Sequence, residues 1–133
     1  MATEHINPDG MHRNPAFSQA ILLPAGARTL LIGGQNAVGP DGQVVGKGDL
    51  GAQTVKALEN LQLCLQAAGA RVEDLVQLRL HIVGDQDLRP GFGAWMAVWG
   101  NRPKPPTVTG IRVHGLANPD YLIEIEAMAV VPD

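Results

Sequence analysis

The carboxylates near the end of the chain are its clearest candidates for chemistry. In 123-IEIEA-127, Glu124 and Glu126 alternate with Ile123 and Ile125. Side chains two residues apart on a strand share a face, so both carboxylates would lie on one side and both isoleucines on the other. A partly buried carboxylate can hold a water molecule and act as a general base. From spacing alone, the alternative that both are solvated strand residues stays open, and Glu126 is expected to be structural.

The remaining reactive side chains lack the spacing that a metal site requires. No two histidines have metal-ligand spacing and only one cysteine is present; these residues are His5, His12, His81, His114 and Cys64. We therefore expect no metal site. A single cysteine also excludes an intrachain disulfide, which favours a reducing compartment.

Composition and charge favour a globular protein of one domain. The 133 residues are 45% hydrophobic and 17% charged, which suits a single domain over residues 1–133. The net charge is −3 and the ten basic residues are scattered, so nothing in the charge pattern favours nucleic-acid binding. Residues 1–17 lack the apolar core of a signal peptide, and no run approaches the roughly 18 apolar residues of a membrane span. We expect a cytoplasmic protein that binds no membrane.

Hydrophobic periodicity predicts the elements that would position these residues. Residues 1–16 are expected to be irregular, and the apolar runs on either side of 24-PAGA-27 to form a β-hairpin. Gly69 is expected to end the first helix, and Asp85 or Asp87 to cap the second. The predicted elements are strands over 18–23, 28–34 and 43–45, a helix over 50–68, a strand over 75–83, a helix beginning near Asp85 or Asp87, and strands over 107–113 and 121–131.

This order of elements predicts an α/β sandwich, in which a mixed sheet is covered by two helices on one face. The uncovered face would carry Gln77, Arg79, His81 and, depending on register, Glu124 or Ile125. Association through that face would bury it and create clefts between subunits. Arg79 and His81 could have a functional role on that face. The alternative is that they are solvated or lie in the interface between subunits.

Four segments carry a resemblance to a known family: 15-PAFSQA-20, 33-GGQ-35, 53-QTVKALENLQLCLQAAGA-70 and 123-IEIEA-127. Together they resemble the RidA/YjgF family of imine and enamine deaminases over nearly the whole chain. The resemblance implies an α/β (α+β) fold of the chorismate-mutase type and a homotrimer whose sheets form a central barrel. It also implies small-molecule sites in the clefts between subunits, which hydrolyse reactive 2-imino acids without a metal or a cofactor.

Position by position, the resemblance implies a divergent site. A family tyrosine, serine and asparagine are replaced by Phe17, Gly33 and Phe92. The carboxylate-binding arginine that follows a proline in the family is replaced by Val108, and a cysteine two positions later by Gly110. The glutamate that positions water is retained as Glu124. The implied site is catalytic Glu124 with substrate-binding Phe17, Gly33, Gln35, Phe92, Val108 and Gly110.

The loss of the arginine bears directly on the substrate. A guanidinium binds a carboxylate through two parallel charge-assisted hydrogen bonds, and valine offers none. Burying an unpaired carboxylate against Val108 would cost several kcal/mol. A 2-imino acid is therefore a poor candidate unless Arg112, Arg79 or another cation enters the cleft, and a neutral, flatter or larger ligand is favoured.

Two functions follow from these observations. The first is a metal-free hydrolase or deaminase that acts on a small metabolite other than the usual 2-imino acids, with water held by Glu124. The second is a non-catalytic homotrimer that binds a small apolar molecule in the same cleft. Retention of Glu124 and Gln35 favours the first, and loss of the arginine and of two hydroxyl groups favours the second.

Overall fold

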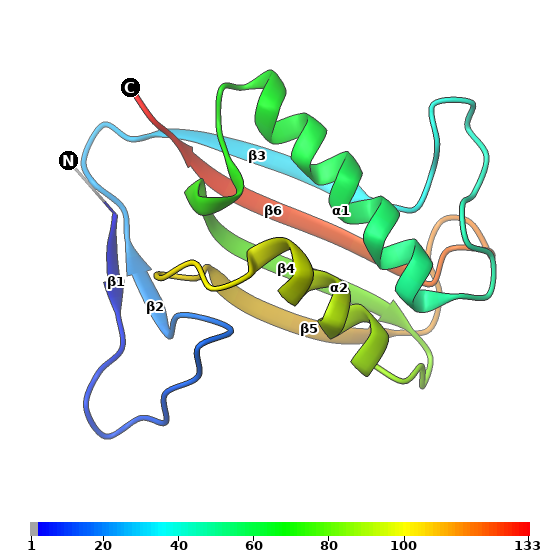
Figure 1. Cartoon of the computed structure of the whole chain (residues 1–133), viewed down its shortest axis with the longest axis horizontal. Helices are drawn as coiled ribbons and strands as arrows, with labels where there is room; N and C mark the ends of the chain where they lie inside the picture. Colours follow the sequence, from blue (N-terminus) through cyan, green and yellow to red (C-terminus); the bar gives the residue numbers. More distant parts are fainter. Residues whose placement is uncertain (1–2) are drawn as a thin grey trace.

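Two helices cover one face of a four-stranded mixed sheet, as the periodicity predicts (Figure 1). The computed structural model describes residues 3–133. Its elements are β1 (Glu4–Ile6), β2 (Ala20–Leu22), β3 (Arg28–Gln35), α1 (Leu50–Ala67), the short 3-10 helix η1 (Val72–Asp74), β4 (Leu75–Val83), α2 (Arg89–Trp99), β5 (Thr107–Val113) and β6 (Ile123–Val131). No helix within residues 3–133 is long and apolar enough to cross a membrane.

The order of strands in the main sheet is β3-β6-β4-β5. Strand β6 pairs antiparallel with both β3 and β4, while β4 and β5 are parallel and are joined through α2. A parallel pair needs such a crossover because its strands must begin at the same end of the sheet. Strands β3 and β5 therefore form the two edges.

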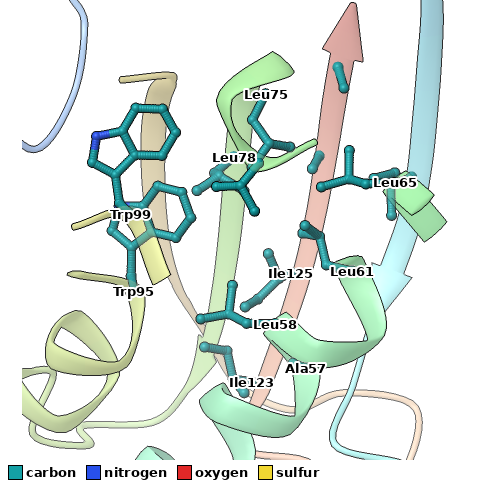
Figure 2. Packing of buried hydrophobic residues seen from close by; sticks show 14 of the residues in the cluster. Ala57, Leu58, Leu61, Leu65, Leu75, Leu78, Trp95, Trp99, Ile123 and Ile125 are labelled. Carbon is teal, nitrogen blue, oxygen red and sulfur yellow. The ribbon is translucent and has the colours of Figure 1, made fainter. Parts of the chain in front are cut away.

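The hydrophobic core fills the space between the helices and the sheet. Leu58 and Leu61 of α1 are at most 2% exposed, and Ile125 of β6 is fully buried. Figure 2 shows these side chains packed against one another, with Trp95 and Trp99 of α2 alongside. The two indole rings are stacked, with centroids 5.6 Å apart. The predicted apolar stripes of both helices thus face the core.

Local signals define α1 well but α2 less well. The Asp49 carboxylate accepts a hydrogen bond from the Ala52 N–H at the start of α1, and Gly69, at φ +77°, follows its end. The prediction that Asp85 or Asp87 caps α2 was wrong. The residue before the first turn of α2 is Leu88, whose side chain forms no capping hydrogen bond. Asp87 instead binds the N–H and guanidinium of Arg89, and these hydrogen bonds lower the pKa of Asp87 to about 2.

Three predictions about the first half of the chain were wrong. Residues 1–16 were expected to be irregular, but they contain β1, which pairs with β2. The predicted hairpin had placed β3, rather than β1, beside β2. Strand β3 pairs instead with β6, about a hundred residues away. The expected strand over residues 43–45 is reduced to one bridge between Val38 and Val44, because glycines at positive φ follow at positions 46 and 48.

Ser18 joins the amino-terminal segment to the loop before β5. Its side chain is 2% exposed, its N–H donates to the Pro106 carbonyl at 3.0 Å, and its hydroxyl donates to the Pro105 carbonyl. The Nδ1 atom of His5 lies 2.9 Å from the Ser18 hydroxyl oxygen, and burial lowers the pKa of His5 below its ordinary value. These contacts hold residues 16–18 against the beginning of β5.

The amide of Gln53 joins α1 to the loop before β6. Gln53 is fully buried, and its Nε2 donates to the carbonyls of Asp120 at 2.9 Å and Gly46 at 3.3 Å. Its Oε1 accepts from the Leu122 N–H at 2.8 Å. Since this loop has no strand partner, the glutamine side chain satisfies backbone groups that would otherwise be buried without a bond.

Gln53→Leu should lower the free energy of unfolding by about 2–4 kcal/mol, because it leaves these backbone groups unpaired in the interior. Urea denaturation would measure the loss. Gln66→Leu, at an exposed position of the same helix, is the matched control and should change the unfolding free energy by less than about 0.5 kcal/mol. A comparable effect of the two substitutions would contradict the proposed role of the amide.

Candidate functional site

A cavity of about 180 Å³ lies between the two helices and the sheet, next to the segment that Ser18 holds in place. It is bounded by α1 and α2 on one side and by β4, β5 and β6 on the other. The residues that line it are almost all apolar: Ala16, Phe17, Leu50, Thr54, Leu58, Leu78, Leu80, Ile82, Leu88, Gly91, Phe92, Trp95, Val108, Gly110, Ile123 and Ile125.

Four of the predicted substrate-binding residues line this cavity together. Phe17 comes from the amino-terminal segment, Phe92 from α2, and Val108 and Gly110 from one face of β5. Phe92 is 56% exposed, so this wall of the cavity is open to solvent. Residues separated by ninety positions in the sequence are thus gathered around one space.

The cavity offers almost no polar group to a ligand. Its one side-chain hydroxyl, on Thr54, donates to the Leu50 carbonyl at 2.7 Å within α1. Among residues 3–133, no charged side chain lines it. The Trp95 indole N–H is buried without a hydrogen-bond partner in the described part of the chain. The chemistry of this space is therefore that of an apolar pocket.

Neither of the two arginines considered as substitute anion binders lines the cavity. The Arg112 guanidinium donates to the carbonyls of Gly84 at 2.9 Å and Gln86 at 3.1 Å, which ties β5 to the loop after β4. Arg79 forms an ion pair with Glu126 at 3.0 Å on the opposite face of the sheet. Both cations already have partners in the isolated chain.

The other three predicted residues lie away from the cavity. Ile123 and Ile125 line it, so the alternation of β6 directs Glu124 to the uncovered face of the sheet. Gly33 and Gln35 belong to the end of β3, where the pairing with β6 is irregular. The Gln35 amide donates to the Gly33 carbonyl at 3.1 Å.

Gly34 makes room for the Glu124 side chain. A Cβ atom at position 34 would lie 2.5 Å from the Glu124 Cδ and 2.7 Å from its Oε1. The same atom at position 33 would meet nothing within 4 Å. Gly34 was not among the predicted site residues, although an adjacent pair of glycines at a strand end is a signal of close backbone approach.

The seven predicted residues therefore form two groups. One group lines the cavity. The other lies around the end of β3, where the Glu124 carboxylate is on the uncovered face of the sheet and Gln35 pairs with Ile125. The cavity group is Phe17, Phe92, Val108 and Gly110, and the carboxylate group is Gly33, Gln35 and Glu124. One copy of the chain does not bring the two groups together. Thr54, Leu58 and Trp95 also line the cavity but were not predicted to do so, because helical periodicity assigns such residues to the core without indicating that a space remains beside them. No cluster of three or more metal-ligating side chains occurs within residues 3–133.

Gly34→Ala should displace the Glu124 carboxylate, because the added methyl group occupies its present position. The side chain can rotate, so the cost in unfolding free energy should stay below about 1.5 kcal/mol. A crystal structure of the variant would show the carboxylate moved. Gly33→Ala is the matched control, in which the carboxylate should keep its position; displacement in both variants, or in neither, would contradict this account.

Comparison with known proteins gives consistent matches. The family model described as Endoribonuclease L-PSP matches residues 11–131. A RutC family protein of Pyrococcus horikoshii is 31% identical over 113 residues, which cover 85% of each chain. The crystal structure of YyfB from Yersinia pestis, of the conserved Rid protein family, is 37% identical with a TM-score of 0.87, covering 98% of this chain and 100% of that one. The structure of TdcF from Escherichia coli with bound serine is 26% identical with a TM-score of 0.71, covering 83% and 85%.

Proposed function

The chain belongs to the RidA/YjgF (Endoribonuclease L-PSP) family, and we propose that it is a small-metabolite hydrolase or deaminase whose complete site forms between two copies. The observation that carries the proposal is the separation of the predicted residues into two groups. The cavity group opens beside the edge strand β5. Glu124 lies on the uncovered face of β6, next to Gly34 of the opposite edge strand β3, so the carboxylate and the cavity are on different faces of the sheet.

The site would be complete where the cavity of one copy lies against the carboxylate group of a neighbouring copy. Repeated head-to-tail, this contact generates a ring, and three copies close the homotrimer that the family resemblance implies. The uncovered sheet face supports association, because it presents Leu31, which is 74% exposed, with the half-buried Met128 opposite it on β6. Assembly would bury this surface in the interior of the ring.

In the complete site, Glu124 is the group that acts on water. Its carboxylate takes a proton from a water molecule whose oxygen attacks the carbon of a C=N bond. The π electrons of that bond move to the nitrogen, which takes up the proton and leaves a carbinolamine. The C–N bond of the carbinolamine then breaks with its electrons going to the nitrogen, and the hydroxyl proton is transferred to that nitrogen. Ammonia or an amine leaves, and a carbonyl compound remains. A general base of this kind contributes about 10²–10⁴-fold to the rate.

The substrate we propose is uncharged and carries an aromatic or branched apolar group. The apolar group would occupy the cavity, where Phe17, Phe92 and Val108 offer contact area but no hydrogen bond. A carboxylate would lose its hydration there and find no cation, since Arg112 is held by two carbonyls. Cleavage of RNA has less support, because the cavity has no cation for a phosphate and the net charge is −3.

A second candidate function is binding without turnover. The observation that favours it is the apolar lining of the cavity in a single chain, where within residues 3–133 no charged side chain is present and the Thr54 hydroxyl is already bonded to the Leu50 carbonyl. A homotrimer of this kind would bind an apolar molecule and release it unchanged. The two candidates differ in one respect that can be measured, namely whether Glu124 is needed for product formation.

Turnover should depend on Glu124. With a panel of freshly generated imines, both uncharged aromatic ones and 2-imino acids, Glu124→Gln should lower the rate of ammonia release by at least about a hundredfold. Glu126→Gln is the matched control, because Glu126 lies on the same strand and face but is paired with Arg79. Equal rates for the wild type and Glu124→Gln would contradict the catalytic role, and no turnover by the wild type would favour the binding function.

Charge should decide which ligands bind. Benzamide and benzoate have nearly the same shape, but only benzoate is charged, so benzamide should raise the melting temperature more because it leaves no ion unpaired in the apolar cavity. Val108→Arg should reverse the preference, since a guanidinium pairs with the carboxylate. Differential scanning fluorimetry would measure both. Stronger stabilisation of the wild type by benzoate would exclude the proposed ligand class.

A further inference from the structure

His81 lies directly opposite Glu124 on the uncovered face of the sheet. The antiparallel register of β4 and β6 pairs His81 with Glu124 and Arg79 with Glu126. Leu80 and Ile82 line the cavity on the other face, so His81 shares the face of the carboxylate. Side chains paired in this way have Cβ atoms about 4.5–5.5 Å apart. The two cross-strand pairs are thus neighbours, and each combines a basic side chain with an acidic one.

Only one of these two pairs is closed in the isolated chain. The Arg79 and Glu126 side chains meet at 3.0 Å. The Glu124 side chain takes part in none of the ion pairs or side-chain hydrogen bonds formed within residues 3–133. The His81 Nδ1 atom is buried, and it has no hydrogen-bond partner in the same part of the chain. The His81 imidazole and the Glu124 carboxylate therefore face each other without an ion pair or hydrogen bond, next to the Arg79–Glu126 ion pair.

The burial of Nδ1 determines what the imidazole can do. A proton on that atom would be buried without an acceptor, which costs free energy. The neutral ring therefore carries its proton on Nε2, which is left as a hydrogen-bond donor. A rotation of either side chain, or one bridging water molecule, would connect Nε2 to a Glu124 oxygen.

The other groups around this pair do not compete for it. On β4 the nearest charge is Arg79, and on β6 it is Glu126; these two are bound to each other. From β5, the residue paired with His81 is Ile111, which is uncharged. On the β3 side, Glu124 lies against Gly34, so His81 is its one basic cross-strand neighbour in the described chain.

We propose that His81 is a positioning residue for Glu124. Its Nε2–H donates to one carboxylate oxygen, which leaves the other oxygen free to accept a proton from water. The role rests on the proposed function, because Glu124 is the group that acts on water. It gives a role to a histidine whose buried Nδ1 atom has no partner within residues 3–133 and which faces the unpaired Glu124 carboxylate.

A double-mutant cycle tests the pair independently of any activity. His81→Gln and Glu124→Gln would be made singly and together, and urea unfolding would be followed at fixed protein concentration at about pH 5.5 and about pH 8.5, on either side of the range in which histidine ordinarily changes charge. We expect the effects to be non-additive by at least about threefold in the unfolding equilibrium constant at about pH 8.5, where a histidine is ordinarily neutral and Nε2–H can donate to the carboxylate.

The cycle of Arg79→Gln and Glu126→Gln is the matched control. A guanidinium keeps its charge at both pH values, so the coupling of this pair should not change between them. Additive effects of the His81 and Glu124 substitutions at both pH values, alongside a coupled control pair, would overturn the proposal whatever the turnover.

Imine hydrolysis provides the second readout. His81→Gln should lower kcat by at least about tenfold, with KM within about twofold, and should change the shape of the pH–rate profile. An unchanged kcat in a protein whose pair is coupled would overturn the positioning role. If the cycle shows coupling but the wild-type protein has no turnover, the His81–Glu124 interaction is supported and the enzymatic function is contradicted. Failure of the interaction and failure of the enzymatic function can thus be distinguished.

Discussion

The alternation of side chains along β6 is the constraint on which the rest of the structure depends. This strand pairs on both edges, with β3 and β4, so its backbone is fixed and each side chain must take one face or the other. Ile123 and Ile125 enter the core beneath α1, and this requires Glu124 to lie on the uncovered face. A slip of one residue in register would reverse all of these assignments. The division of the candidate site into two groups is thus a direct result of how the core is built.

Sequence reasoning predicted the elements whose signals are local. The bounds of β4 and β5 agree with the structure, and α1 ends within one residue of its prediction, because alternation, helical spacing and a terminal glycine are all visible in a short window. The partner of β3 could not be found in this way. Its alternation is equally compatible with a neighbour about ten residues away and with β6, and the long-range pairing is chosen by the core as a whole.

The candidate site was predictable in part and for a similar reason. The resemblance identified Phe17, Phe92, Val108 and Gly110, and the structure gathers them around one cavity. It could not indicate that Glu124 faces away from them, since that requires the register of β6 against two neighbours. Nor could it indicate that Gly34 and His81 both lie against Glu124, because that depends on what they face across a strand pair rather than on their spacing along the chain.

The position of Val108 on the opposite face of the sheet from Glu124 has a consequence for how such a protein can diverge. The residue proposed to select the ligand and the residue proposed to act on water lie on different faces of the sheet within one chain. A substitution on one face therefore leaves the other face intact, so under the proposed function the ligand could change by single steps while the group that acts on water is inherited unchanged. A fold organised in this way can supply a series of descendants with different specificities and one conserved reaction.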